Sequence, residues 1–575
     1  MENAFQKDTP KIFMEKPIWW KDEVVYQIYP KSFYDSNNDG IGDIKGITQK
    51  LDYLEKLGIT MLWICPIFTS PMVDNGYDIS DYKGIQPEFG TMADFDELLT
   101  AAKKRGIKII LDLVVNHSSD EHVWFQSALN DPTSKYRNYY IFKKGKNASP
   151  PNNWRSIFGG SVWEKVPNEE NMYYFHTFDK KQPDLNWENP ILRQEIYDMI
   201  NWWLEKGISG FRIDSITFIK KDQDYADVTP DGADGLASVK HKGRNRPGIK
   251  DFLTELNRET FQKYECVSVG EAPGVTYEEY DQYIGHNGYF NMIFDFHYAD
   301  IDVESGSEWF RRTNWQVKEL KDQIFKSQEA IQRNGWGANF LENHDQPRSI
   351  SKYINDPKYQ NDIGAKALGT LFFFLRGTPF IYQGQELGMK NFIRETIADF
   401  NDVSSLDNYQ RSMLEGFTSK EALEFVNQRS RDNSRTPFQW NASETAGFSE
   451  STSPWLKVVG DHKTINAELQ MEQEDSVFYY YKKMIQLRNS SKYRDTLIYG
   501  EFVPVNTNDY IIAYERIIDT ETIQVVINLR NQASFIDGIS GEILLNNYSE
   551  ITCERNGLKL QPYQALVLRK DKNHE

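Results

Sequence analysis

Cysteine and long apolar runs are scarce in this sequence of 575 residues. Its three cysteines, Cys65, Cys266 and Cys553, are too few for a disulfide framework and too far apart for a zinc site. No run approaches the roughly 20 apolar residues of a membrane-spanning helix, and the polar start, residues 1–11, lacks the apolar core of a signal peptide. We therefore expect a cytoplasmic protein that does not cross a membrane.

Positive charge is also in short supply. The chain has 66 Lys and Arg against 84 Asp and Glu, which gives a formal net charge of -18 at pH 7. Phosphates would meet a surface of like charge, so we expect neither nucleic acid nor an anionic membrane as a partner. The composition does not determine the oligomeric state, and a monomer is our expectation.

The sequence does have a regular alternation of two kinds of segment. Short apolar runs rich in β-branched residues alternate with stretches of helical period, and eight such pairs follow one another. This pattern implies parallel strands with right-handed crossovers, and eight repeats favour an α/β fold closed into a (β/α)8 TIM barrel over an open doubly wound sheet. The predicted strands are 24–33, 61–68, 108–116, 210–215, 266–271, 291–297, 339–345 and 379–382. The predicted helices are 44–57, 93–105, 191–206, 249–261, 277–283, 315–331, 363–375 and 477–487.

Three stretches interrupt this alternation. Residues 117–188 follow the third strand and are too long and polar for a simple loop, so they predict a small inserted domain. A second insertion covers about 392–454, and from 492 onward alternating apolar residues punctuated by Asn and Gly predict an all-β domain. The predicted domains are an N-terminal extension (1–13), a catalytic barrel or domain A (14–116 and 189–491), an inserted domain B (117–188) and a C-terminal β-sandwich or domain C (492–575).

Acidic side chains recur at the ends of the predicted strands. In a (β/α)8 barrel these ends converge on one mouth, so polar residues there are candidates for function. A single acid at such a position is commonly a helix cap or half of a structural ion pair, but four of the eight strands end in this way. The acids are Asp112 ahead of Asn116 and His117, Asp214 after Arg212, Glu271, and Asp345 after His344.

Converging carboxylates without a Cys/His metal cluster suit a reaction with a cationic transition state, and glycosidic cleavage is the main example. That reaction needs one carboxyl group that stays ionised and another that holds a proton near neutral pH. Arg212 lies two residues before Asp214 on the same face of its strand, where its charge favours an ionised Asp214. Glu271 on the adjacent strand is then the natural acid.

These four segments resemble, in order and spacing, the four motif regions of the α-amylase superfamily of glycoside hydrolases, family 13. Further segments look like its oligo-1,6-glucosidase and α-glucosidase branch, and the resemblance covers nearly the whole chain from Met14. These segments are Val-Val-Tyr-Gln-Ile-Tyr-Pro30, Asp74-Asn-Gly-Tyr77-Asp78, Gln-Pro-Asp-Leu-Asn-Trp187, His344-Asp-Gln-Pro-Arg348 and Ser430-Arg-Asp-Asn-Ser-Arg-Thr-Pro-Phe-Gln-Trp440.

The resemblance implies a retaining, exo-acting α-glucosidase that removes nonreducing terminal glucose from small oligosaccharides, with isomaltose and its oligomers as expected substrates and no organic cofactor. Asp214 matches the family's nucleophile, Glu271 its acid and then base, and Asp345 the third acid, which stabilises the distorted sugar. The residues that match positions lining the glucose pocket or closing its far side are His117, Arg212, His344, Asp74, Tyr77 and Arg431. Arg435 lies on the same loop as Arg431, so the partner of Asp74 stays open between the two.

The segment from Asp35 to Asp43 is a candidate metal site. It places oxygen-bearing side chains at alternating positions around a glycine turn, as an EF-hand loop does, but position twelve is Gly46 where an EF-hand has Glu. The residues alone are equally typical of an ordinary Asp/Asn/Gly turn, whereas the family resemblance implies a structural Ca²⁺. The implied ligands are Asp35, Asn37, Asp39, the Ile41 carbonyl and Asp43.

Several features leave the substrate open. Ser215 follows the matched nucleophile, where the family has Val with α-1,6 bonds and Ala or Thr with α-1,4 bonds or sucrose-type substrates. The basic loop from Lys240 to Arg246 is either solvated or a phosphate-binding loop, as in a trehalose-6-phosphate hydrolase. A sucrose isomerase or glucosyl transferase is a further alternative, although Gln346 stands where related isomerases tend to have Asn. A non-enzymatic role like that of amino-acid transporter heavy chains is disfavoured, because the acids are present and a membrane helix is absent.

Overall fold

The structure is a computed structural model that describes residues 18–570 apart from 452, 490–491 and 555–556. The predicted N-terminal extension, 1–13, lies outside the described residues. Within the part of the chain that is described, no helix is both long and apolar enough to cross a membrane.

Eight parallel strands close into a barrel in the order β1-β15-β14-β13-β12-β10-β5-β2, so the predicted (β/α)8 fold is confirmed. Helices cover the outside of the barrel and side chains fill its inside, which explains why the strands read as continuous apolar runs. The strands are β1 (Val25–Ile28), β2 (Met61–Ile64), β5 (Lys108–Leu113), β10 (Gly210–Ile213), β12 (Val267–Gly270), β13 (Met292–Phe294), β14 (Gly337–Asn339) and β15 (Thr378–Tyr382).

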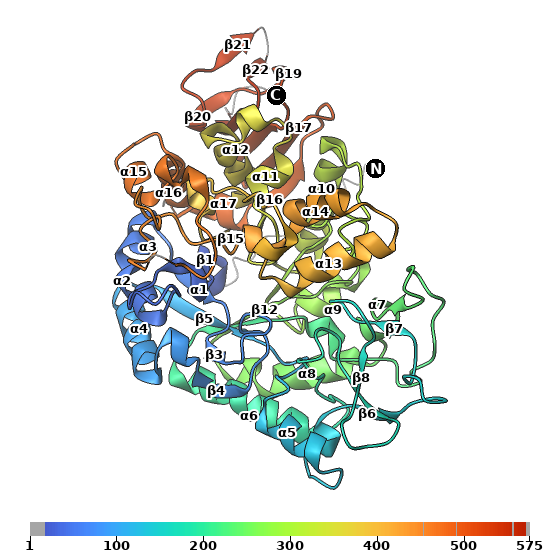
Figure 1. Cartoon of the computed structure of the whole chain (residues 1–575). Helices are drawn as coiled ribbons and strands as arrows, with labels where there is room; N and C mark the ends of the chain where they lie inside the picture. Colours follow the sequence, from blue (N-terminus) through green and yellow to red (C-terminus); the bar gives the residue numbers. More distant parts are fainter. Residues whose placement is uncertain (1–17, 452, 490–491, 555–556, 571–575) are drawn as a thin grey trace, which may run out of the picture.

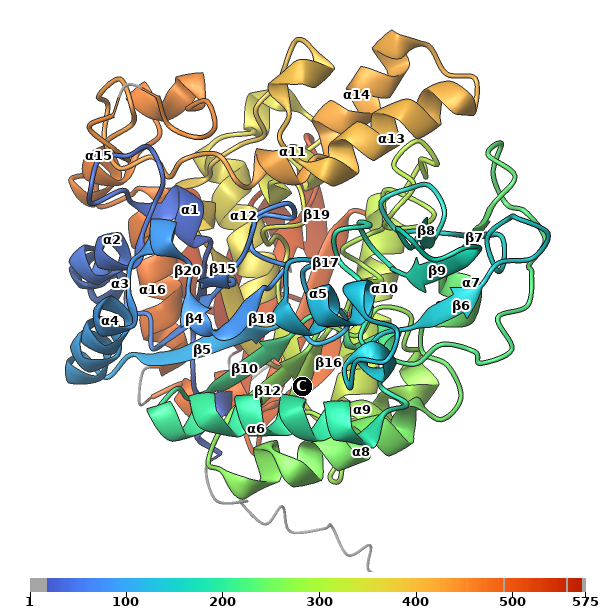
Figure 2. The same ribbon diagram turned by 60° about the horizontal axis from the view of Figure 1, so that its bottom comes forward.

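Helices surround the barrel (Figures 1 and 2). Local signals set their ends: Thr91 and Asp94 form a reciprocal capping box at the start of α4, and α6 ends at Gly207, whose φ of 106° is left-handed. The principal helices are α2 (Ile44–Gln49), α3 (Leu51–Leu57), α4 (Met92–Lys104), α6 (Pro190–Lys206), α8 (Ile249–Glu259), α9 (Tyr280–Ile284), α10 (Val317–Asn334), α12 (Asp362–Phe373) and α16 (Val477–Asn489).

The seventh predicted strand, 339–345, is wrong in its position, because β14 begins and ends earlier and only Asn339 is shared. The apolar residues Phe340 and Leu341 prolong the strand-like pattern after the chain has left the barrel. The side chain of Asn343 then accepts a hydrogen bond from the main-chain N–H of Asp345, and this local bond turns the chain.

Two predictions near the amino terminus also need correction. The strand predicted at 24–33 ends at Ile28, and Pro30, which has no N–H for a sheet, opens the short helix α1 (Pro30–Phe33). The single helix predicted at 44–57 is two helices, α2 and α3, which meet at Lys50.

The segment between β5 and α6 forms a small antiparallel sheet beside the barrel (Figure 2). Its strands are β6 (Phe142–Lys144), β9 (Met172–Phe175) and β8 (Trp163–Lys165), after helix α5 (Val123–Asn130). A separate pair joins β7 (Trp154–Arg155) to β11 (Ala237–Ser238), which comes from the loop after β10. Trp154 and Phe175 of the inserted segment share an apolar cluster with Phe218 and Tyr225 of that loop, so the two segments pack as one unit.

The second predicted insertion contains a helical hairpin, α13 (Val403–Leu414) and α14 (Ser419–Arg429), which lie side by side in Figures 1 and 2. After α17 (Arg494–Tyr499) the chain forms antiparallel sheets of five and three strands. The first has β16 (Glu501–Pro504), β17 (Ile511–Ile518), β18 (Glu521–Asn528), β23 (Ala565–Lys570) and β20 (Gly541–Asn546), and the second has β19 (Ser534–Asp537), β22 (Gly557–Leu560) and β21 (Thr552–Glu554).

Alternate residues of β17 face two different cores. Ile511 and Ala513 join an apolar cluster with the three-stranded sheet, whereas Ile512 and Tyr514 belong to the large cluster that includes the barrel. The C-terminal sheets are therefore attached to the barrel through a shared apolar core.

Candidate active site

Three acids lie around one cavity at the carboxyl ends of the barrel strands. Asp214 directly follows β10, Glu271 directly follows β12, and Asp345 lies in the loop after β14. All three line a cavity of about 200 Å³. Because they come from three strands of one closed barrel, the fold itself brings these predicted acids together.

Arg212, which is fully buried on β10, binds both acids of the predicted pair. Its Nη1 donates to Oδ1 of Asp214 and to Oδ1 of Asp112, each at 2.7 Å. Its Nη2 lies 3.0 Å from Oε2 of Glu271. One guanidinium therefore holds the carboxyl groups of Asp214 and Glu271 close together.

Glu271 and Asp214 differ in how firmly they hold a proton. Burial raises the pKa of Glu271 to about 8, and the neighbouring charge of Arg212 opposes the rise while Asp214 and Asp345 add to it. Burial also raises the pKa of Asp214, again against the attraction of Arg212. At neutral pH Glu271 is therefore protonated, as a general acid must be.

Asp345 is held in its ionised form. Nη2 of Arg435 donates to its Oδ1 at 2.8 Å, and Nη1 of Arg431 lies 3.4 Å from the same atom. Burial alone would raise the pKa of Asp345, but the charges of Arg431 and Arg435 hold it well below its usual range. The cavity thus combines a protonated carboxyl group with an ionised one.

Ser215 follows Asp214 in the left-handed backbone region, with a φ of 43°. This turn points its main-chain N–H at Oε2 of Glu271, to which it donates at 2.7 Å, while the Ser215 hydroxyl is 3.4 Å from the same oxygen. The backbone rather than the side chain of Ser215 makes the shorter contact with Glu271.

Tyr77 and His344 form one side of the site. The Tyr77 hydroxyl donates to Oδ2 of Asp112 at 2.9 Å and lies 2.5 Å from Nε2 of His344, and the two rings are stacked. Nδ1 of His344 lies 2.8 Å from Nε2 of Gln27. A proton on Nε2 of His344 satisfies all of these contacts, and burial lowers the pKa of this histidine well below its ordinary value.

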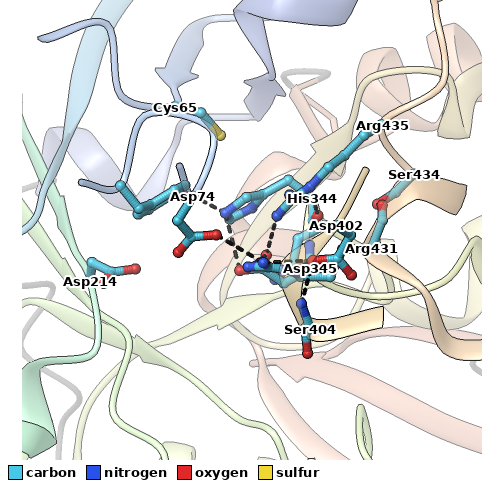
Figure 3. Close-up of polar contacts among 12 residues, drawn as sticks. Cys65, Asp74, Asp214, His344, Asp345, Asp402, Ser404, Arg431, Ser434 and Arg435 are labelled. Atoms are coloured by element: carbon cyan, nitrogen blue, oxygen red, sulfur yellow. Dashed lines mark hydrogen bonds and ion pairs between the residues drawn. The ribbon is translucent and has the colours of Figure 1, made fainter. Parts of the chain in front are cut away.

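Arg431 connects Asp74 and Asp345, which line the cavity, to the buried Asp402 (Figure 3). Its Nη2 lies 2.8 Å from Oδ1 of Asp74, and its Nε donates to Oδ1 of Asp402 at 2.7 Å. The sequence left the partner of Asp74 open between Arg431 and Arg435. In the structure Arg431 pairs with Asp74, and Arg435 binds Asp345 instead.

The inserted segment contributes the remaining wall. Nε2 of His117 lies 3.0 Å from the main-chain oxygen of Tyr77, and Nε2 of Gln182 donates to Oδ2 of Asp74 at 3.1 Å. The ring of Phe158 lies 5.0 Å from the guanidinium of Arg431. All the predicted substrate residues except Arg212 and His344 line the cavity directly, and those two lie behind it against the acids.

Asp402, Gln182 and Phe158 are functional candidates that the sequence reading did not single out. Gln182 begins the quoted segment that ends at Trp187, so a signal for it was present. Asp402 and Phe158 lie in the two insertions, where no periodic pattern shows which side chains turn toward the barrel mouth.

The basic loop from Lys240 to Arg246 divides into two groups in the structure. Arg246 and Lys242 form ion pairs with Asp222 at 2.8 and 3.7 Å, away from the cavity. Lys240 and Arg244 line the catalytic cavity and a neighbouring cavity of about 590 Å³. The loop is therefore neither wholly solvated nor a single cluster of cations.

The candidate metal loop is closed by its own hydrogen bonds. Asp35 accepts from the main-chain N–H groups of Asn37, Asn38 and Gly40, and Asp43 caps α2 by accepting from Gly46. Across the described ranges no group of three His, Cys, Asp or Glu is placed to hold a metal ion. The oxygen ligand types suit Ca²⁺, but binding requires the loop to exchange some of these hydrogen bonds for bonds to the ion.

Residues 27–500 match the family described as "Alpha amylase, catalytic domain". The chain belongs to this family. An oligo-1,6-glucosidase of Parageobacillus thermoglucosidasius is a 44% identical relative, over 96% of this chain and 99% of that protein. A trehalose-6-phosphate hydrolase of Bacillus subtilis (strain 168) is 41% identical over 96% of this chain and 99% of its own length.

A solved structure agrees with the fold. The isomaltulose synthase of Klebsiella sp. LX3 has a TM-score of 0.90 and 38% identity, covering 96% of this chain and 100% of that one. The matched residues include both insertions and every strand of the barrel, apart from the first residues of β1.

Proposed function

We propose that this glycoside hydrolase is a retaining, exo-acting α-glucosidase that releases nonreducing terminal glucose from isomaltose-type oligosaccharides. The observation that carries the proposal is one cavity lined by Asp214, Glu271 and Asp345 together with the Asp74–Arg431 ion pair. The ion pair fills space that a glucan would need to continue beyond its terminal glucose, so only a chain end fits. The relatives named oligo-1,6-glucosidases support the choice of linkage.

In the proposed reaction Asp214 attacks the anomeric carbon while Glu271 gives its proton to the glycosidic oxygen. The bond from that carbon to the oxygen breaks, the remaining sugar leaves as an alcohol, and a glucosyl ester with Asp214 is left. Glu271, now ionised, takes a proton from water as the water attacks the same carbon and the ester bond to Asp214 breaks. Glucose is released and both carboxyl groups return to their starting states.

Asp345 makes no covalent bond in this scheme. Positive charge develops on the ring oxygen and anomeric carbon as the bond breaks, and a carboxylate that stays ionised at neutral pH lowers the energy of that charge. The shared contact of Asp214 and Glu271 with Arg212 favours the short spacing of a retaining enzyme, about 5–5.5 Å, over the wider spacing of an inverting one.

The test is product analysis with isomaltose, maltose, sucrose and trehalose 6-phosphate, each at the same concentration. We expect fastest glucose release from isomaltose, with the α-anomer appearing first in the NMR spectrum. Asp214→Asn should lower kcat by at least about a thousandfold. First appearance of the β-anomer, or normal turnover by the Asn variant, would contradict the proposed roles.

We also propose that the loop from Asp35 to Asp43 binds a structural Ca²⁺, with Asn37, Asp39 and the Ile41 carbonyl as further ligands. Its support is an oxygen-only ligand set in a turn that Gly40 closes with a φ of 92°. No catalytic step is assigned to the ion.

We propose further that the enzyme works as a monomer in the cytoplasm. Cys65, Cys266 and Cys553 are all free thiols, as is usual in a reducing compartment. Light scattering of the purified protein tests the monomer, and a dimer mass would contradict it.

A further inference from the structure

Arg244 differs from the other arginines at the catalytic cavity. Of the three that line it, Arg429 pairs with Asp300 at 2.9 Å and Arg431 pairs with Asp74 at 2.8 Å. Arg244 makes no hydrogen bond or ion pair with any residue that the structure describes, and only more distant carboxylates act on its charge. Its guanidinium donors are therefore available to a ligand.

Arg244 is placed where the catalytic cavity meets the larger neighbouring cavity, because it lines both. It comes from the end of helix α7 (Lys240–Gly243) and lies against the turn that follows Glu271. A side-chain carbon added at Gly274, three residues after Glu271, would lie 2.5 Å from Nε of Arg244. The glycine thus leaves room for the guanidinium beside the segment that carries the proton donor.

Given the function proposed above, glucose occupies the catalytic cavity, and the leaving sugar extends into the neighbouring one. We propose that Arg244 binds the leaving sugar by donating hydrogen bonds to its hydroxyl groups, and that the sugar it selects is uncharged. This makes Arg244 a specificity residue on the far side of the bond that breaks.

The charges around the larger neighbouring cavity favour an uncharged sugar over a phosphorylated one. Its wall has four carboxylates, Asp295, Asp300, Glu304 and Glu319, against the two basic side chains of Lys240 and Arg244. Lys240, the other cation of the loop that lines this cavity, already donates to the hydroxyls of Ser305 and Ser307, each at 2.7 Å. A phosphate with a charge of about −1.5 to −2 would meet one free guanidinium and several carboxylates.

The experiment compares kcat/KM for isomaltose and for p-nitrophenyl α-glucoside, whose aryl leaving group has no hydroxyls for Arg244 to bind. In Arg244→Ala we expect kcat/KM for isomaltose to fall about tenfold to a hundredfold, the range of a charged hydrogen bond, while the aryl substrate changes less than about twofold. Arg244→Lys should restore part of the loss. Lys242→Gln, which removes a charge from the same short helix but lines neither cavity, should leave both values unchanged.

Three results would overturn this assignment. Equal losses on both substrates would mean that Arg244 acts through Glu271, and unchanged isomaltose kinetics would mean that it binds no sugar. Faster cleavage of trehalose 6-phosphate than of any uncharged disaccharide, lost in Arg244→Ala, would mean that the guanidinium binds phosphate. If the unaltered enzyme cleaves another uncharged disaccharide but not isomaltose, the linkage proposed above fails, and the same variants are compared on that disaccharide.

Discussion

The proton on Glu271 is the residue-scale feature on which the proposed chemistry depends. Burial places the pKa of its carboxyl at about 8, so the acid form dominates below that pH and is lost above it. We expect kcat/KM for isomaltose to fall tenfold for each pH unit above about 8. The measurement is a pH series with aryl glucosides and isomaltose in parallel.

Two comparisons make this pH dependence specific to Glu271. An activated aryl leaving group needs little help from an acid, so its kcat/KM should fall less steeply at high pH. In Glu271→Gln the activity should be about 100-fold to 10,000-fold lower, and its fall at high pH should disappear. If the activity of that variant still fell above about pH 8, the fall would belong to the titration of another group.

Ser215 shows how a departure from the family pattern can leave the chemistry intact. The backbone at this position is left-handed, and its N–H, which any residue except proline has, makes the short contact with Glu271. The hydroxyl lines the cavity, so it acts on the shape and polarity of the site. Ser215 is therefore one of several residues that line the cavity, and its short contact with Glu271 does not depend on its hydroxyl group.

At the scale of elements, the sequence predicts the barrel better than the loops that complete the site. Strands buried on both faces need apolar, β-branched residues, so their pattern survives in the sequence, and the acids at their ends are found with them. The seventh strand was misplaced because Phe340 and Leu341 are buried outside the sheet. Asp402 was missed because its insertion has no period to show which side chains face the barrel.

Asp402 links helix α13 to the substrate cavity. It caps α13 by accepting from the main-chain N–H groups of Ser404 and Ser405, and it accepts from Nε of Arg431. We expect Asp402→Ala to cost about 1 kcal/mol through the lost cap and to raise KM for isomaltose about tenfold, since Arg431 loses a partner. Thermal unfolding and steady-state kinetics measure the two effects.

Helix α14 provides the matched control for that variant. Thr418 caps α14 in a reciprocal capping box with Glu421 and has no contact with Arg431. Thr418→Ala should therefore cost a similar ~1 kcal/mol and leave KM unchanged. A similar rise of KM in both variants would show that destabilising the hairpin, and not releasing Arg431, is responsible.

The loop from Asp35 to Asp43 makes a prediction of its own about metal removal. A bound ion stabilises the folded protein by about 2.7 kcal/mol when free Ca²⁺ is 100 times its Kd. We expect EGTA to lower the Tm and added Ca²⁺ to restore it, with little effect on kcat because no catalytic step uses the ion. Calorimetry in the two conditions measures the shift.

Substitutions of Asp39 and Asp131 distinguish an effect on ion binding from an effect on loop structure. Both are exposed aspartates that accept main-chain N–H groups two residues ahead, from Ile41 and Thr133. Asp39→Asn should reduce the Ca²⁺-dependent part of Tm, and Asp131→Asn should not. If Ca²⁺ did not change the Tm of the unaltered protein, the loop would be an ordinary turn that binds no ion.

At the scale of the whole molecule, the barrel and the C-terminal sheets depend on each other. Arg516 of β17 is fully buried and donates to the main-chain oxygens of Phe374, Leu497, Ile498 and Gly500. Burial lowers the pKa of Arg516 to about 9, and it remains charged at neutral pH. The cation therefore connects the ends of helices α12 and α17 to a strand of the C-terminal sheet.

Removing the Arg516 side chain should destabilise the barrel and the C-terminal sheets together. Arg516→Met leaves several buried carbonyls without donors, so we expect a cost of at least about 3 kcal/mol. Tryptophan fluorescence, far-UV circular dichroism and loss of activity should shift together to lower temperature, because the two parts share one apolar core. Arg569→Met, in the same sheet but in an exposed pair with Glu542, should change stability by less than about 1 kcal/mol. If Arg516→Met lowered only the circular dichroism transition and activity survived above it, the C-terminal sheets would be an independent unit.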